Sequence, residues 1–339
     1  FGHMNIAIVG ATGNVGRKII EILEKKQINI ENLFLLASKN SEGKKINYNG
    51  NEHIVTDLEK FDFSSVKIAF FAAGSGVAEK WAHVAAEKTI VIDNSKYFRK
   101  DPDIPLIVPE VNSKKLSDVK NKNIIANANC SVIPVVVALK PLHDLYNINR
   151  IVASTYQSVS GAGKSAMDEL LSQTEDYFQN KEIDSKNFTK QIAFNAIPHI
   201  DSFLENGYTK EEQKTTDEIK KILDKKIKVT STCVRIPVLV SHCISANVEF
   251  NKKCDLDEIR KVLSTSPGCK VIDEHQDGGY ITPIEAEDKF ETFISRIRLD
   301  ESRENTINLW IVSDNLVKGA ALNAVQIAES LIKNDFYGK

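Results

Sequence analysis

The stretch Asn5–Gly16, NIAIVGATGNVG, decides the fold of the first part of the chain. Asn5–Val9 is apolar enough for a buried strand, and a helical pattern then runs from Asn14 to about Lys26. The face of this helix that would be buried carries Ile19, Ile20 and Leu23. Glycines between strand and helix let backbone N–H groups at the helix start face a phosphate. The spacing is GxxGxxG rather than GxGxxG, and a tight turn without a ligand is the alternative. We expect a nucleotide site here.

Further apolar runs follow this segment and alternate with helical stretches such as Val77–Lys88. The apolar runs are Leu33–Ala37, Lys67–Ala72, Ile90–Ile92, Leu106–Val108 and Ile124–Ala126. Strands that alternate with helices imply a parallel sheet covered on both faces. We therefore expect the chain before Cys130 to form a doubly wound α/β domain.

The pattern changes after Cys130. Ser131–Leu145 is helical in pattern, with Pro134 tolerated in its first turn. Longer strands are expected at Ile151–Gln157, Val229–Ile236, Ile244–Phe250, Thr292–Leu299 and Thr306–Ser313, and helices at about Ala166–Phe178, Thr215–Lys226 and Leu256–Leu263. This arrangement predicts an α+β domain with a mostly antiparallel sheet. A last amphipathic helix is expected over Leu316–Ile332.

The composition excludes several classes of protein. The 339 residues include 46 acidic and 44 basic ones, and this balance argues against nucleic-acid binding. The most apolar segment, Val132–Leu139, is far shorter than the roughly 18 residues of a membrane span. Five cysteines without a CxxC spacing exclude a disulfide framework and a zinc ribbon, and favour a reducing cytoplasm. We see no leader sequence, and Phe1-Gly2-His3 before Met4 resembles a remnant of cloning.

The end of the second predicted strand bears on the choice of cofactor. A site that prefers NAD usually places Asp or Glu there, where it bonds the ribose 2′-hydroxyl. Here the strand is followed by Ser38-Lys39-Asn40-Ser41, and Lys44 comes shortly after. Hydroxyl groups and cations suit a 2′-phosphate, so we expect NADP. A solvated polar loop is the alternative.

Cys130 is the candidate nucleophile, because it lies between an apolar strand and a helix that begins near Ser131. The unpaired N–H groups and the dipole at a helix N-terminus favour the thiolate, which is the reactive form. The other four cysteines lie in or near strands or in a loop and read as small hydrophobic residues. A proton shuttle is also needed. His242, which follows Arg235 closely, is the candidate, and His199 competes with it.

Seven ordered motifs resemble the aspartate-β-semialdehyde dehydrogenase family along nearly the whole chain. They are GATGNVG at Gly10–Gly16, DNSKYFRKDPDIPLIVPEVN at Asp93–Asn112, NANCSV around Cys130, YQSVSGAG at Tyr156–Gly163, EEQK at Glu211–Lys214, RIPVLVSH at Arg235–His242 and NAVQIAE at Asn323–Glu329. The resemblance implies a phosphorylating aldehyde dehydrogenase that interconverts L-aspartyl-4-phosphate and L-aspartate-4-semialdehyde with NADP, in the biosynthesis of lysine, threonine, methionine and isoleucine. It also implies a homodimer formed through the sheet of the second domain.

By this resemblance, Cys130 forms a thioacyl enzyme, Gln157 orients the reacting group and His242 acts as general acid–base. Arg235 would bind the substrate carboxylate, Glu211 its amino group, and Arg99 and Lys214, with Asn94 or Asn129 nearby, the phosphate. The cofactor site would comprise Gly10, Thr12, Gly13, Asn14, Val15, Ser38, Ser160, Gly163 and Gln326. No metal is implied. The implied fold is a Rossmann-type NADP-binding domain (4–129 with 318–339) plus an α+β catalytic and dimerisation domain (130–317).

Two departures and three alternatives remain. Many family members carry Arg where Asn40 stands, so Lys39 or Lys44 would have to supply the charge for the 2′-phosphate, and a relaxed preference for NADP over NAD is expected. Lys96 replaces the second Ser of the family's DNSS. N-acetyl-γ-glutamyl-phosphate reductase uses the same thioacyl chemistry, and glyceraldehyde-phosphate dehydrogenase is more distant. The third alternative is a nucleotide-binding regulatory or scaffold protein without catalysis.

Overall fold

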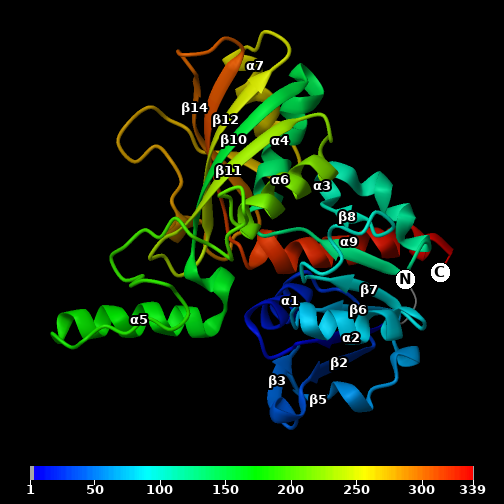
Figure 1. Ribbon diagram of the computed structural model, residues 1–339. Coiled ribbons are helices and arrows are strands. Elements are labelled where there is room, and N and C mark those ends of the chain that lie inside the picture. The colour runs from blue at the N-terminus through cyan, green and yellow to red at the C-terminus, as the bar shows by residue number, and fades with distance from the viewer. Residues whose placement is uncertain (1–3, 339) are drawn as a thin grey trace. The chain divides into compact units, whose positions relative to one another are not determined.

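The computed structural model describes residues 4–338 (Figure 1). Phe1-Gly2-His3, which we interpreted as a cloning remnant, and Lys339 lie outside the described residues. The chain divides into two compact units: unit 1 runs to Ala128 and resumes at Ala320, and unit 2 is Asn129–Gly319. The expected domains, 4–129 with 318–339 and 130–317, differ from these units by one or two residues at each boundary.

Unit 1 is built on a parallel seven-stranded sheet in the order β5-β2-β1-β6-β7-β9-β8. Its strands are β1 (Asn5–Val9), β2 (Asn32–Ala37), β5 (Thr56–Asp57), β6 (Ile68–Phe71), β7 (Ile90–Asp93), β8 (Leu106–Ile107) and β9 (Ile124–Asn127). Its helices are α1 (Asn14–Lys25), α2 (Ser75–Ala86), α3 (Pro109–Asn112) and α9 (Leu322–Lys333). β6, β7 and β9 are buried throughout, as strands covered on both faces must be.

The chain reverses direction across this sheet at β1, which pairs with β2 on one side and β6 on the other. In open α/β sheets a ligand binds in the crevice at such a reversal, outside the carboxyl ends of the strands. The glycine segment Gly10–Gly16 occupies that position: residues 10–13 connect β1 to α1, and Gly16 lies in the first turn of α1. The predicted buried face of α1 is confirmed, because Ile19, Ile20 and Leu23 are 1%, 3% and 0% exposed.

Unit 2 is built on a mixed six-stranded sheet in the order β11-β10-β12-β15-β14-β13. Its strands are β10 (Ile148–Gln157), β11 (Lys228–Arg235), β12 (His242–Phe250), β13 (Cys269–Val271), β14 (Thr292–Leu299) and β15 (Thr306–Ser313). Three of its pairings are antiparallel, and the β10–β11 and β13–β14 pairings are parallel. The sheet is therefore mostly antiparallel, as expected.

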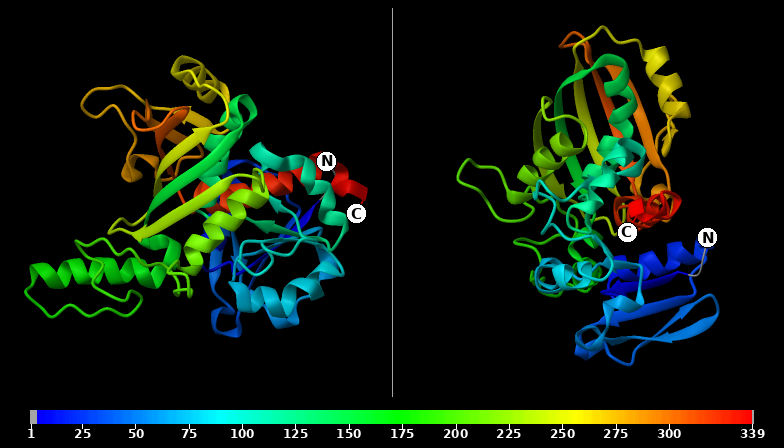
Figure 2. Two further views of the ribbon diagram at one scale, coloured as in Figure 1. Left: turned by 45° about the horizontal axis from the view of Figure 1, so that its top comes forward. Right: turned by 90° about the vertical axis from the view of Figure 1, so that its right-hand side faces the viewer.

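The helices of unit 2 cover one face of this sheet. α4 (Val132–Tyr146), α6 (Lys210–Ile222) and α7 (Leu256–Thr265) pack against the strands, and α4 contacts both other helices. α8 (Pro283–Ala286) is a single turn beside β15. α5 (Lys164–Phe178) extends away from the sheet (Figures 1 and 2). Half-buried Tyr156 and Trp310 lie on the opposite sheet face, which Ile281 and Ala286 cover in part.

Three expectations about local structure need correction. α6 begins at Lys210 rather than at Thr215, because Thr209 and Glu212 form a capping box. The last helix lies where it was expected, but its first turn, Val317–Ala321, is π-helical and leads directly into α9. The hairpin β3 (Lys45–Tyr48) and β4 (Asn51–Ile54) was not expected, although the Asn49-Gly50 pair at its turn is a strong hairpin signal.

Candidate active site

One edge of the unit 2 sheet collects three of the predicted catalytic and binding residues. Gln157 ends β10 and Arg235 ends β11, and these two residues are register partners across the parallel pair. His242 begins β12, which runs antiparallel to β10. Because β12 starts where β10 and β11 end, the three side chains originate at the same edge of the sheet.

Cys130 lies against His242 at this edge, with 3.1 Å between its Sγ and the Nε2 of the imidazole. The thiol is half-buried and directly precedes Ser131, the N-cap of α4. The Ser131 side chain makes no capping hydrogen bond to α4. The positive end of the helix therefore lies beside the sulfur, and this position favours the thiolate.

His242 is neutral, and the structure fixes which nitrogen carries its proton. The backbone N–H of Ser158 donates to Nδ1 over 2.9 Å, so Nδ1 is an acceptor and the proton belongs on Nε2. Complete burial, and secondarily the charge of Arg235, lower the pKa of His242 to about 3. The imidazole therefore presents an N–H donor to Cys130 at neutral pH.

A buried polar cluster holds the backbone that contacts His242. Asn315 accepts hydrogen bonds at Oδ1 from the Ser158 hydroxyl over 3.1 Å and from the Ser241 N–H over 2.8 Å. Its amide donates to the hydroxyl of Ser160 over 2.9 Å. Ser160, predicted to bind the cofactor, is only 3% exposed and belongs to this cluster. Gly163, predicted for the same site, lies at the N-cap of α5 with φ +100°.

Arg235 is 7% exposed and donates from Nη1 to the Ser158 carbonyl over 2.8 Å. Burial lowers its pKa, and the negative charges of Cys130 and Glu211 act in the opposite sense. Guanidinium nevertheless stays protonated in proteins, so Arg235 is a buried cation. A Cβ added to Gly161 would lie 3.2 Å from both Arg235 Nη1 and His242 Nε2, so only glycine leaves this space open.

Glu211 and Lys214 lie on the first turns of α6 and are joined to Asn129. Glu211 is 7% exposed, accepts a hydrogen bond from the Asn129 amide over 2.6 Å and pairs with Lys214 at 3.3 Å. Lys214 also pairs with Asp201 at 3.3 Å. Asn129 accepts at Oδ1 from the Ser131 N–H over 3.0 Å, and thereby links this charged group to the start of α4.

Gln157 is 2% exposed, and its Oε1 accepts a hydrogen bond from the Thr155 hydroxyl over 2.8 Å. This contact fixes the orientation of the amide and leaves its N–H₂ group as the end available to a ligand. His199, the competing histidine, stacks on Phe203 with 4.4 Å between ring centroids. Of the two histidines, the structure therefore pairs His242 with Cys130.

Unit 1 contains a cavity of about 590 Å³ at the carboxyl ends of β1 and β2. Its lining includes Gly10, Thr12, Gly13 and Ser38 from the predicted cofactor site, and also Lys39 and Ser41. Asn14 and Val15 begin α1 beside it, and Gln326 lies in α9 of the same unit; none of these three is part of the cavity lining. Of the two lysines considered for a 2′-phosphate, Lys39 belongs to the cavity lining and Lys44 does not.

The glycine turn fits a pyrophosphate group. A Cβ on Gly10, whose φ is +87°, would lie 2.4 Å from the Ala72 carbonyl oxygen, and one on Gly16 would lie 2.0 Å from that of Gly10. These glycines allow strand, turn and helix to pack closely. By contrast, a Cβ added to Gly13 would have its nearest neighbour at 3.7 Å, an ordinary contact distance. Gly13 is the N-cap of α1, and α1 has no acidic residue in its first turn. The open, positive helix end suits an anion.

Arg99 also belongs to unit 1, where it is hydrogen-bonded to the last residue of β9 and to the residue that follows β7. Its Nε donates to the Asn127 carbonyl over 2.8 Å and its Nη2 donates to the Asn94 carbonyl over 2.9 Å. The Asn127 amide donates in turn to Asn94 Oδ1 over 2.9 Å. The contact of Arg99 with phosphate stays a prediction.

Within residues 4–338, no group of three or more His, Cys, Asp or Glu side chains could hold a metal ion.

Sequence reasoning missed the residues that contact and position the predicted catalytic and binding side chains. These are Ser158, Gly161, Glu218, Asn315 and Thr155. Glu218 accepts the Asn129 N–H over 2.7 Å, directly before the nucleophile. Ser158 and Gly161 lie inside the YQSVSGAG motif and were available as candidates. Asn315 gives no local signal, because its partners lie more than 70 positions away along the chain.

Comparison with known proteins places these features in context. Family models described as the NAD-binding and the dimerisation domain of semialdehyde dehydrogenases match residues 5–119 and 139–318. An aspartate-semialdehyde dehydrogenase of Rickettsia bellii is 49% identical over 97% of this chain and 98% of that protein. Aspartate semialdehyde dehydrogenase II of Vibrio cholerae, solved in complex with ASA, superimposes with a TM-score of 0.96 at 45% identity, over 98% of this chain and 99% of that one. The aspartate semialdehyde dehydrogenase of Candida albicans, solved with NADP, shares the fold with a TM-score of 0.76 at 24% identity, over 98% of this chain and 99% of that one.

Proposed function

The chain belongs to the aspartate-semialdehyde dehydrogenase family, and from this premise we propose that it interconverts L-aspartyl-4-phosphate and L-aspartate-4-semialdehyde through a thioacyl intermediate on Cys130. Members of this family are oxidoreductases of amino-acid biosynthesis, and their cofactor is NADP. One observation carries the proposed mechanism: the 3.1 Å contact between Cys130 Sγ and His242 Nε2 at the start of α4.

The thiolate of Cys130 begins the reductive direction by attacking the acyl carbon of aspartyl phosphate. A C–S bond forms, the bond between the acyl carbon and the phosphate oxygen breaks, and phosphate leaves with that electron pair. The resulting thioester divides one difficult reduction into two easier steps. A thiolate is the better nucleophile for the first step, and the helix end beside Cys130 favours that form.

NADPH, when bound, supplies the hydride for the second step, and NADP⁺ accepts it in the reverse direction. Reduction of the thioester leaves a hemithioacetal oxyanion on the Cys130 adduct, which collapses when the C–S bond breaks and the thiolate departs. The Nε2–H of His242 is aimed at the sulfur and can donate to the oxyanion and then to the leaving thiolate. A donor fixed where charge develops is an effective way to lower such a barrier.

The charged residues of unit 2 match the charges of the amino acid. Arg235, a buried cation, would bind the α-carboxylate in a bidentate manner, and Glu211 would accept from the α-ammonium group. Lys214, which pairs with Glu211 at 3.3 Å, would contact phosphate. The free amino group distinguishes this substrate from N-acetylglutamyl phosphate, because an acetylated nitrogen has no need of a carboxylate partner.

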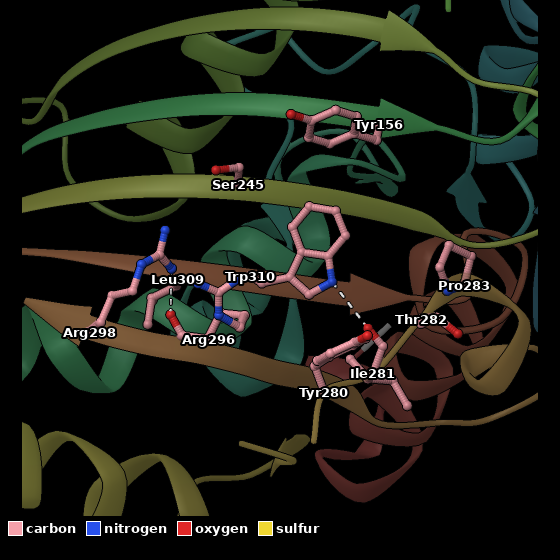
Figure 3. A pocket seen from close by; sticks show the side chains of 10 residues that line it. All are labelled: Tyr156, Ser245, Tyr280, Ile281, Thr282, Pro283, Arg296, Arg298, Leu309 and Trp310. Carbon is pink, nitrogen blue, oxygen red and sulfur yellow. Dashed lines mark hydrogen bonds between the residues drawn. The ribbon is translucent and has the colours of Figure 1, made fainter. Parts of the chain in front are cut away.

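We also propose that the face of the unit 2 sheet opposite α4, α6 and α7 forms a homodimer. Half-buried Tyr156, Ser245 and Trp310 line a cavity of about 370 Å³ on this face, together with Arg296 and Arg298 (Figure 3). A sheet face that carries half-buried aromatic side chains is typical of an interface with a second copy of the chain. Replacing Ser245 by Arg at its centre should raise the monomer fraction in light scattering, and an unchanged mass would contradict the interface.

The proposed compartment is the cytoplasm. All five cysteines are free in the structure, which fits a reducing environment. Among the described helices, none has the length and apolar character needed to cross a membrane.

The direct test of function is formation of NADPH by the purified protein from aspartate semialdehyde, NADP⁺ and inorganic phosphate. We expect activity that requires phosphate and disappears in Cys130→Ala. Activity toward N-acetylglutamate semialdehyde instead would favour the reductase alternative. Binding of NADP⁺ without turnover of either aldehyde would favour a regulatory protein.

A further inference from the structure

The cofactor cavity of unit 1 contains a buried carboxylate that the cofactor motif does not explain. Asp57 ends β5, is 4% exposed and lines the cavity. Its Oδ1 accepts the backbone N–H of Glu59 over 3.0 Å and so caps a short turn. Within residues 4–338, the side-chain hydrogen bond of this residue is made through Oδ1, which leaves Oδ2 as the acceptor that a ligand in the cavity could meet.

The order of strands tells which part of a dinucleotide would meet Asp57. β5 lies at the edge of the sheet and pairs with β2, with Ala37 opposite Asp57, and β2 pairs with β1. The pyrophosphate belongs at the glycine turn after β1, and the ribose belongs at the end of β2, beside Ser38. The next position outward, after β5, is left for the base.

The apolar part of the cavity lining suits a flat aromatic ring. Leu58 follows Asp57 directly, and Val77 and Trp81 lie on α2, whose Lys80 pairs with Glu59 at 3.8 Å. These three side chains line the cavity and offer apolar surface to the faces of a base. Asp57 then provides an acceptor at the edge. Adenine presents an exocyclic amino group at its own edge, whereas hypoxanthine presents a carbonyl oxygen at the same place.

We propose that Asp57 determines the specificity for adenine, because its Oδ2 accepts a hydrogen bond from the exocyclic amino group of the cofactor. A site built to bond an N–H group rejects an analogue that lacks it, since the buried polar group is left unpaired. Hypoxanthine would also bring its carbonyl oxygen against a carboxylate. The proposal rests on NADP being the cofactor and adds which residue selects its base.

The test is the dissociation constant of NADP⁺ and of its hypoxanthine analogue, measured by isothermal titration calorimetry on the full chain. The wild type should bind the hypoxanthine cofactor about 10- to 100-fold more weakly, the range expected for a lost hydrogen bond to a charged group. Asp57→Asn keeps an oxygen for the Glu59 N–H and can turn its amide N–H₂ toward the carbonyl of hypoxanthine. Its preference should therefore shrink to about one or reverse.

Glu59→Gln is the matched control, because Glu59 lines the same cavity, is exposed and pairs with Lys80 at 3.8 Å. It should change both dissociation constants by the same factor. Asp57→Ser is the second variant if Asp57→Asn fails to fold, because serine also caps turns. If the variants of Asp57 keep the wild-type ratio, the residue only caps the turn and the proposal is wrong. Failure of the wild type to bind either cofactor would overturn the cofactor assignment itself.

Discussion

The backbone N–H of Ser158 donates to Nδ1 of His242 over 2.9 Å, and this contact decides what His242 can do. Because Nδ1 accepts, the neutral ring carries its proton on Nε2, the nitrogen that lies 3.1 Å from Cys130 Sγ. His242 can therefore donate to sulfur or to a bound oxygen without first taking up a proton. For His242 to remove the thiol proton, Nε2 would have to be the unprotonated nitrogen, and the hydrogen bond from the Ser158 N–H to Nδ1 would have to break.

The first prediction concerns stability at acid pH. The unfolded chain protonates His242 near its ordinary pKa of about 6.5, whereas burial lowers the folded pKa to about 3. Between these values the unfolded state binds the extra proton, so His242 makes the folded state lose stability as the pH falls. Asn at position 242 can still accept the Ser158 N–H but does not titrate.

Urea unfolding at equal protein concentration, at about pH 7 and about pH 4, measures this effect. The wild type should lose more free energy of unfolding between the two values than His242→Asn. Equal losses would mean that His242 titrates in the folded protein much as it does in the unfolded one.

The second prediction concerns Arg235→Lys. Lysine keeps the charge but cannot bind a carboxylate in a bidentate manner. We expect the KM for aspartate semialdehyde to rise about 10- to 100-fold, with a smaller fall in kcat. Steady-state kinetics at saturating cofactor and phosphate provide the test. A large fall in kcat with an unchanged KM would assign Arg235 to the chemical step instead of substrate binding.

The third prediction concerns Gly161→Ala. The new methyl group would lie 3.2 Å from Arg235 Nη1 and His242 Nε2, so these side chains must shift. We expect kcat/KM to fall about 10-fold or more, because small displacements of catalytic groups are costly. Gly76→Ala is the matched control, since nothing lies within 4 Å of the new Cβ on this residue of α2. Equal activity in the two variants would contradict the close packing around His242.

The sequence predicted regular elements well where a periodic pattern was long. β10, β11, β12, β14 and β15 all lie where period-2 or β-branched runs indicated strands. The start of α6 was misplaced although Thr209 and Glu212 carry the capping-box signature, and the β3–β4 hairpin was overlooked although Asn49-Gly50 marks it. Both errors came from signals that were present and unused.

Other features could not be read from local sequence. The π-helical turn at the start of the last helix is one of them; at this turn the backbone of Gly319 lies so close to Cys130 that a Cβ on Gly319 would be 3.2 Å from the Cys130 carbonyl oxygen. The tautomer of His242 depends on Ser158, which lies 84 positions earlier in the chain. The family resemblance named Cys130 and His242 as catalytic, and the structure adds which nitrogen of His242 faces the sulfur.

The most direct test of the central claim is a single turnover without phosphate. Mixed with aspartate semialdehyde and NADP⁺ but no phosphate, the wild type should form about one NADPH per chain and then stall, because the thioester on Cys130 has no acceptor. Mass spectrometry should place the aspartyl group on the peptide containing Cys130, and added phosphate should restart NADPH formation. Cys130→Ser should show neither the burst nor the adduct, whereas Cys254→Ser should show both. Continuous turnover without phosphate, or a full burst in Cys130→Ser, would contradict the thioacyl mechanism.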